Sequence, residues 1–180
     1  QAIWDHPEFR RRFMDSYVAA TDVEARVPEA DREQLGSVND LMGAGKLDEA
    51  QELLAIQTSN PKCNAIFDFL LANVYFQKAL SIEPVDEGAD ADSASGAASQ
   101  PVAAKMTEAE LLARSAKSAR AATRKVSRFR RAYGLLAQVY LRQGRYAEAL
   151  PMLTRVIELG GGDKLTYGSL GYAYASAGQD

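Results

Sequence analysis

The chain has 180 residues, 47% of them hydrophobic, so it can bury a core of ordinary size. A formal net charge of −3 and a pI near 5.3 argue against global attraction to nucleic acid or anionic lipid. Cys63 is the single cysteine, which excludes an intrachain disulfide and a thiolate metal cluster. The apolar runs are far shorter than the roughly 20 residues of a membrane span. We therefore expect neither nucleic-acid binding nor membrane insertion.

The segment 1–33 predicts a helical cap. Asp5 is placed as an N-cap, and Glu8 completes a capping box three residues later. Phe9 and Tyr17 then recur on one face of the same helix. We expect this segment to cover the exposed apolar end of whatever follows.

A repeat with a period of about 34 residues dominates the rest of the chain. Five positions recur in order with the same character: aromatic, aliphatic, small, aromatic and glycine. The two sets are Tyr133, Leu136, Ala137, Tyr140 and Gly144, followed by Tyr167, Leu170, Gly171, Tyr174 and Gly178. Such a period predicts stacked helix-turn-helix units.

Earlier units of the same kind can be traced. Leu71, Ala72 and Tyr75 repeat the aliphatic, small, aromatic triplet, and Gly45 marks the turn of a unit before them. The second helix after that turn carries its apolar residues at Leu47, Ala50 and Leu54. We therefore expect four units, of which the last is only half present.

An insertion interrupts the second unit. Counting back from Tyr133 places its second helix at Leu112, Ser115, Ala119 and Ala122, much later than an unbroken repeat would. The intervening stretch near 84–104 has four acidic residues among Ala, Ser and Gly, a composition that cannot offset its ordering entropy by burial. We expect a disordered acidic loop there.

These residues resemble the tetratricopeptide-repeat (TPR) family, in which small residues let paired helices approach closely while Tyr and Leu fill the gaps. The resemblance implies an all-α fold, an α-α superhelix of antiparallel helix pairs with an N-terminal capping helix. Its units fall at about 34–63, 64–123, 130–163 and, as a half unit, 164–180. It also implies a protein-interaction scaffold that binds a peptide or protein partner in a concave groove lined by the first helices.

The groove residues can be predicted from the repeat register. They lie one step before and one step after the packing triplets, and they are a mixture of amide, apolar and basic side chains. They are Asn39, Met42, Phe69, Asn73, Phe76, Arg131, Gln138, Arg142, Leu165 and Tyr172. Amides suit a peptide backbone, and apolar pockets suit its side chains.

No catalytic or cofactor-binding pattern emerges. His6 is the only histidine and lies in the predicted capping helix, so a structural or solvated role is expected. Cys63 is interpreted as a half-buried filler. Gly43 to Lys46 lacks the flanking residues of a phosphate-binding loop. The glycine run 160–162 is interpreted as a helix cap and inter-repeat turn.

A stripe of basic residues also recurs along the chain. Six cations recur at helical spacing, and three interpretations are open: a solvent-exposed face, a docking site for the acidic loop, or a contact with an acidic partner protein. The six are Arg114, Lys117, Arg120, Arg124, Arg128 and Arg131. A turn near residues 125–128 would split them into two patches.

Two alternatives to an interaction scaffold are open for the chain as a whole. It is either an architectural spacer that self-associates through its incomplete C-terminal repeat, or a regulatory fragment of a larger enzyme. Its compartment is open, with the bacterial periplasm slightly favoured over the cytoplasm.

Overall fold

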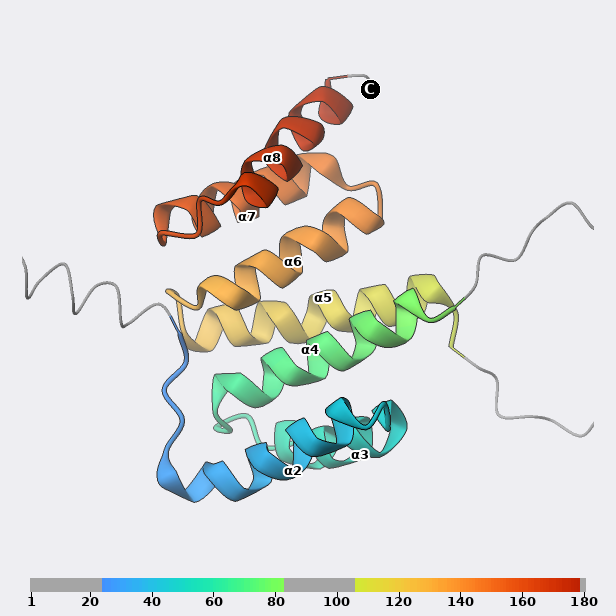
Figure 1. Cartoon of the computed structure of the whole chain (residues 1–180), viewed down its shortest axis with the longest axis vertical. Coiled ribbons are helices and arrows are strands. Elements are labelled where there is room, and N and C mark those ends of the chain that lie inside the picture. Colours follow the sequence, from blue (N-terminus) through green and yellow to red (C-terminus); the bar gives the residue numbers. More distant parts are fainter. Residues whose placement is uncertain (1–23, 83–105, 179–180) are drawn as a thin grey trace, which may run out of the picture.

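The computed structural model describes residues 24–82 and 106–178 (Figure 1). These residues form seven α-helices and one short 3-10 helix, and no strand occurs among them. The elements are η1 (Glu29–Asp31), α2 (Arg32–Gly43), α3 (Leu47–Thr58), α4 (Ala65–Leu80), α5 (Glu108–Lys125), α6 (Arg130–Arg142), α7 (Tyr146–Glu158) and α8 (Lys164–Ala177). The all-α prediction is confirmed.

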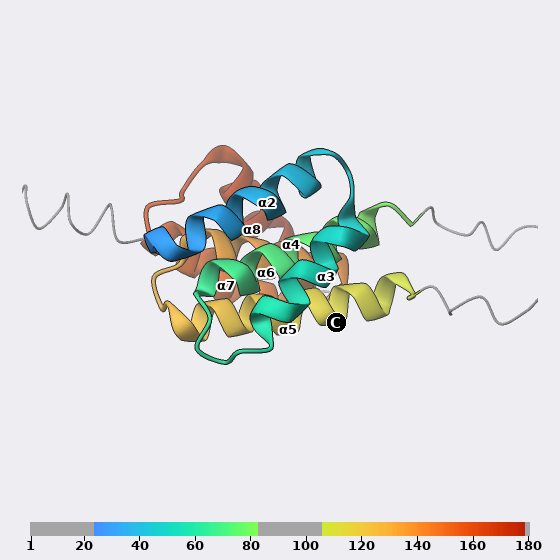
Figure 2. The same cartoon turned by 90° about the horizontal axis from the view of Figure 1, so that it is seen from below.

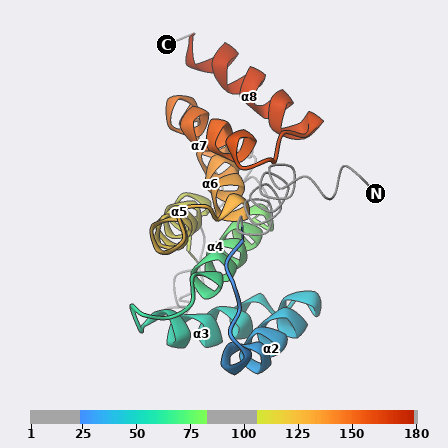
Figure 3. The same ribbon diagram turned by 90° about the vertical axis from the view of Figure 1, so that its left-hand side faces the viewer.

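The helices form a stack in which each one packs against the next along the chain. The helices α2 and α3 lie at one end and α8 at the other (Figure 1). Figure 2, seen from the α2–α3 end, shows the helices lying crosswise over one another. In Figure 3 the first helices of the pairs, α2, α4, α6 and α8, lie toward one side of the stack, and α3, α5 and α7 lie toward the other. This is the arrangement of an α-α superhelix.

Local sequence signals define where the helices begin. The Asn64 side chain accepts a hydrogen bond from the Ile66 amide at the start of α4. At the start of α5, Thr107 and Glu110 form a reciprocal capping box. Asp163 caps α8 by accepting a bond from the Thr166 amide. The start of α5 is therefore stabilised by its own capping residues.

The turns within the first and third pairs use glycine for the same backbone reason. Gly45 and Gly144 have φ values of +73° and +70°, in the left-handed region that disfavours a side chain. Each amide bonds back to the preceding helix, Gly45 to the Met42 carbonyl and Gly144 to the Leu141 carbonyl. The predicted turn glycines therefore reverse the chain between paired helices.

Small residues hold the paired helices together, as the repeat predicted. Ala50, Ala72, Ala137 and Ala149 are all completely buried. Gly171 is different: its surroundings are open, and an added Cβ would meet nothing within 4 Å. The expectation that Gly171 packs against a paired helix is therefore corrected, because no described helix covers that face of α8.

Two predicted segments cannot be compared with the structure. Most of the capping segment 1–33, including His6, and the acidic stretch near 84–104 lie outside the described residues. Within 24–33 the chain leads into η1, and α2 begins at Arg32. The division into a cap and repeat units therefore remains a prediction.

Candidate functional site

Four of the predicted groove residues occupy one register position in successive helix pairs. Asn39 and Asn73 are one repeat period apart, as are Gln138 and Tyr172. They come in turn from α2, α4, α6 and α8, the helices toward one side of the stack in Figure 3. Repeat units stack in equivalent orientations, so equivalent positions form a row. We call Asn39, Asn73 and Gln138 the amide row, which Tyr172 continues on α8.

The amide row has unused hydrogen-bonding capacity. Asn39 and Gln138 are exposed and Asn73 is half-buried. None of the three side chains hydrogen-bonds to another residue in the described ranges 24–82 and 106–178. Each primary amide offers two donors and an acceptor, the groups that complement a peptide N–H and C=O. The row can therefore bind polypeptide backbone without first breaking a bond within the described part of the chain.

Apolar side chains lie one turn beyond the amides on α2 and α4. Met42 and Phe76 are half-buried and pack on the main hydrophobic core. Phe69, also predicted for the groove, is only 5% exposed and stacks on Phe129 with ring centroids 5.1 Å apart. The helix α4 packs against α3, α5 and α6, so eleven of its sixteen residues are buried. Phe69 is therefore a core residue, and the prediction that it lines the groove is wrong.

The two predicted arginines differ in how strongly they are engaged. Arg131 is exposed, and its guanidinium carbon lies 5.0 Å from the centroid of the Phe69 ring, which it covers. Burial raises the pKa of the nearby Glu24 carboxyl, and the positive charges of Arg131 and Arg130 offset only part of that rise. Arg142 donates from Nε to Oε1 of Glu108 at 2.7 Å, tying the end of α6 to the start of α5. Arg131 thus retains N–H donors for a ligand, whereas Arg142 already has a hydrogen-bonded acidic partner.

Aromatic residues are exposed on α8. Tyr172 is 57% exposed, and its ring meets that of Tyr146 edge-on with centroids 5.6 Å apart. Leu165, one of the predicted groove residues, is 71% exposed. Together with Gly168 and Ser169, both line a hollow of about 530 Å³. The α8 end of the predicted groove therefore presents apolar surface.

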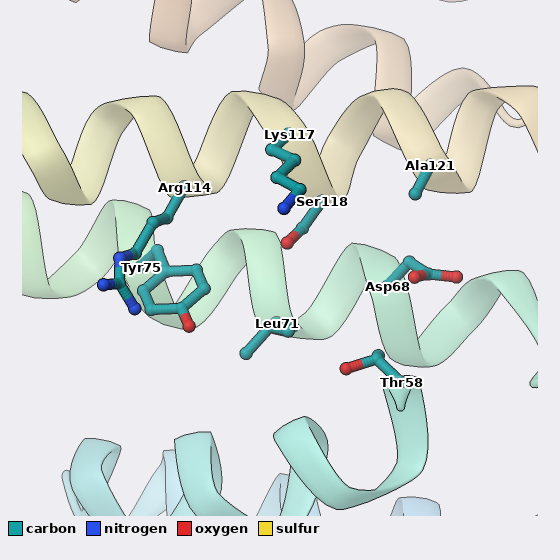
Figure 4. Close-up of a pocket in the computed structure, with 8 residues that line it drawn as sticks. All are labelled: Thr58, Asp68, Leu71, Tyr75, Arg114, Lys117, Ser118 and Ala121. Atoms are coloured by element: carbon teal, nitrogen blue, oxygen red, sulfur yellow. The ribbon is translucent and has the colours of Figure 1, made fainter. Parts of the chain in front are cut away.

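A second hollow, which the repeat register did not predict, lies over α4 between α3 and α5. It has a volume of about 620 Å³. Figure 4 shows its lining, which combines two cations, three hydroxyl groups, one carboxylate and two apolar side chains. The residues are Thr58, Asp68, Leu71, Tyr75, Arg114, Lys117, Ser118 and Ala121. We call it the α3–α5 cleft.

Beside the cleft, Lys125 links α5 to the start of α4. Its Nζ lies 2.6 Å from Oδ2 of Asp68 and 3.0 Å from Sγ of Cys63. Burial lowers the pKa of Lys125, but the hydrogen bonds to Asp68 and Cys63 outweigh burial and raise it overall. Cys63 is half-buried, as predicted, but has a cationic partner from a distant part of the sequence. The cluster anchors two helices.

The basic stripe is divided by the turn between α5 and α6. The helix α5 ends at Lys125 and α6 begins at Arg130. Arg114 and Lys117 line the α3–α5 cleft, whereas the Arg120 guanidinium donates to the Tyr140 hydroxyl at 2.7 Å. Arg131 covers Phe69 on the next helix. The stripe is thus not one continuous surface.

The two glycine-containing motifs serve the backbone. Gly43 ends α2, and residues 44–46 form the turn between α2 and α3. Gly160 has φ +81°, and the Gly161 amide bonds back to the Val156 carbonyl at 2.9 Å, which ends α7. The interpretation of residues 160–162 as a helix cap and inter-repeat turn is confirmed.

Across the described ranges, no group of three or more His, Cys, Asp or Glu side chains is placed to hold a metal ion.

The fold and the register together define an all-α helical repeat protein. Residues 131–159, which comprise most of α6 and all of α7, match the family model of the tetratricopeptide repeat. The chain therefore contains a tetratricopeptide repeat, a kind of repeat that generally serves as a protein-interaction scaffold. A search of the curated proteins finds no match. None of the described helices is long and apolar enough to cross a membrane.

Proposed function

We propose that the amide-row side of the stack binds an extended segment of a partner protein, and that the chain acts as an adaptor rather than as an enzyme. The single observation that supports this most is the amide row itself. One primary amide stands at the same register position in each of three successive units, with no hydrogen bond to another described residue. An architectural role alone requires no such row.

The spacing of the row suits an extended ligand. First helices that pack side by side, as α4 and α6 do, have axes about 8–10 Å apart. An extended chain advances about 3.3 Å per residue. One amide therefore meets a ligand about every third residue, and a ligand of roughly seven residues reaches from the first amide to the third. Met42 and Phe76 supply apolar contacts for the intervening side chains.

Arg131 adds a preference for ligand charge at the α6 end. It is exposed, and the ion pairs within the described ranges do not include it; its close contact is with the face of Phe69. Arg142 contributes less, because Glu108 already compensates its charge. We therefore expect ligands with an acidic residue near the position that meets α6.

The proposal is tested with peptides selected from a random displayed library and measured by calorimetry. Replacing Asn39, Asn73 and Gln138 together with alanine removes about three hydrogen bonds, so affinity should fall about thirtyfold or more. A control variant, Glu52→Ala with Arg124→Ala, changes exposed residues on the second helices and should bind normally. Equal affinity of the two variants would rule out the amide row as the binding site.

A second function, self-association, is favoured by one observation on α8. Tyr167 and Tyr174 are 55% and 61% exposed, whereas their equivalents in α6, Tyr133 and Tyr140, are half-buried and buried. The same stripe of residues is thus covered in the third unit and open in the fourth. Such a stripe can pack on a second copy of the chain. Light scattering of the wild type and of Tyr174→Glu tests this, since a concentration-independent monomer in both would dismiss it.

A further inference from the structure

The α3–α5 cleft is formed by helices that belong to different repeat units. Thr58 comes from the end of α3, α4 forms the floor, and α5 forms the opposite wall. The lining extends from Asp68 to Tyr75 on α4 and from Arg114 to Ala121 on α5. At a rise of about 1.5 Å per residue, each of these two stretches is about 10 Å long. The cleft therefore matches about three residues of an extended polypeptide.

The cleft carries uncompensated positive charge. Arg114 has its guanidinium carbon 6.0 Å from the Tyr75 ring centroid, and neither Arg114 nor Lys117 forms an ion pair with another described residue. The one carboxylate in the lining belongs to Asp68, and Lys125 pairs with it at 2.6 Å. Two cations thus face the cleft, and its only acid is already neutralised.

The repeat itself does not require these cations. Ser115 occupies the position of Ala50 and Ala149 in the other units, so Arg114 corresponds to Glu49 and Glu148. The same alignment equates Lys117 with Glu52 and Pro151. The other two units thus have acidic residues where the second unit has Arg114. The paired cations are therefore a feature of this cleft and not of the helix-pair architecture.

The rest of the lining suits an anionic peptide group. Figure 4 shows Lys117 and Ser118 extending from α5 toward the space above Leu71, with the Tyr75 hydroxyl on the α4 side. Neither hydroxyl, of Ser118 or Tyr75, hydrogen-bonds to another described residue. Leu71 and Ala121 add apolar surface beside the polar groups. Cations, hydroxyl donors and an apolar floor together match a carboxylate on a methylene stem.

We infer that the α3–α5 cleft binds an acidic segment of another protein, with Asp or Glu carboxylates at Arg114 and Lys117. Charge complementarity selects this occupant. Nucleic acid is disfavoured, because two cations on a chain of net charge −3 neutralise too few phosphates. The site is separate from the amide row, so each can fail without the other.

The probe is a fluorescein-labelled peptide, Gly-Asp-Glu-Ala-Asp-Glu-Leu-Gly, with its Asn/Gln counterpart as the uncharged control. Anisotropy is measured on the full chain at low and at physiological ionic strength. We expect the acidic peptide to bind more tightly than the amide peptide and to weaken as salt is added. The double variant Arg114→Glu/Lys117→Glu should lose affinity at least about tenfold.

A matched control makes the same charge change away from the cleft. Arg124→Glu/Lys164→Glu replaces exposed cations of α5 and α8 and should keep wild-type affinity. Circular dichroism confirms that both variants fold. Equal losses in the two variants would show general charge attraction and overturn the assignment, as would tighter binding of a single-stranded oligonucleotide. A variant with residues 84–104 replaced by a Gly-Ser linker of equal length should bind unchanged. If the linker variant bound the acidic peptide much more tightly than the wild type, the chain's own acidic stretch would be the occupant, which would contradict an external partner.

Discussion

The Ser115 hydroxyl donates a 2.8 Å hydrogen bond to the backbone carbonyl of Ala72, with both residues completely buried. The bond joins α5 to α4 across the insertion, where the two helices meet through small residues. It holds together the two helices of the interrupted second unit. A small side chain is required here, and the hydroxyl is an addition to it.

Ser115 should therefore tolerate alanine but not leucine. Ser115→Ala supplies the residue found at Ala50 and Ala149, and the Ala72 carbonyl keeps its helical partner, so the loss is about 0.5–1 kcal/mol. Ser115→Leu should cost about 3 kcal/mol, the upper part of the usual overpacking range, since the site is fully buried. Urea denaturation measures both. A leucine variant as stable as the alanine variant would refute the close approach of α4 and α5.

Lys125 should stabilise the fold chiefly by compensating Asp68. Asp68 is buried, and it stands where the third and fourth units have Tyr133 and Tyr167. Lys125→Met leaves that carboxylate without its cation, which should cost about 2 kcal/mol after allowance for the partial exposure of Lys125. Adding Asp68→Leu should recover most of the loss. A double variant less stable than Lys125→Met, measured by denaturation, would contradict this account.

The same pair predicts a dependence of stability on alkaline pH. The pKa of Lys125 is raised in the folded chain, so the proton is bound more tightly there than in the unfolded chain. The resulting stabilisation is present below the unfolded pKa of about 10.4 and is lost as pH rises through the higher folded value. Melting temperatures should therefore fall more steeply above about pH 10.4 in the wild type than in Asp68→Leu/Lys125→Met. Parallel curves would mean that the pair contributes nothing.

Ala137 and Gly171 occupy equivalent positions and should respond oppositely to leucine. Ala137 is completely buried among Leu153 and Ala173, so Ala137→Leu should cost about 1–3 kcal/mol. Gly171 faces open space, and Gly171→Leu should be neutral or stabilise by up to about 1 kcal/mol through helix propensity. Thermal unfolding of the two variants separates these outcomes. A large destabilisation by Gly171→Leu would indicate that α8 is covered in solution.

Gly161 should resist even alanine. An added Cβ would lie 2.6 Å from Cγ1 of Val156 and 3.0 Å from its carbonyl oxygen, so Gly161→Ala should cost about 1–2 kcal/mol. The neighbouring Gly162→Ala is the control, because its Cβ would meet only the tip of the exposed Tyr167 ring, which can move. Equal stabilities of the two variants would argue against the close turn between α7 and α8.

The helices and their pairing could be predicted because the repeat pattern records helix-to-helix packing directly. Tyr133, Leu136 and Ala137 specify an interface through residue size, and the same sizes recur at Leu71 and Ala72. The burial of a side chain was predicted less well where it depends on residues outside its own helix pair. Phe69 is buried because Phe129, from the turn before α6, packs on it, and Gly171 is exposed because no described helix covers it.

The α3–α5 cleft could not be predicted from spacing along the chain. Its cations lie on one helix, but Thr58 and Tyr75 come from two others, and only the stacking of units brings them together. The contact between Lys125 and Cys63 also joins residues from separate elements, with no local pattern to indicate it. The three residues of the amide row could be named from the sequence because they share one repeat position, and their role in binding stays a prediction.

The central claim, that the amide row binds polypeptide backbone, is tested most directly by a double-mutant cycle on Asn73. A selected peptide is compared with versions N-methylated at single backbone positions, against the wild type and Asn73→Ala. If Asn73 bonds to one backbone N–H, methylation at that position should weaken wild-type binding by about 1 kcal/mol and leave Asn73→Ala unaffected. Losses that are equal in both proteins at every position would contradict the claim.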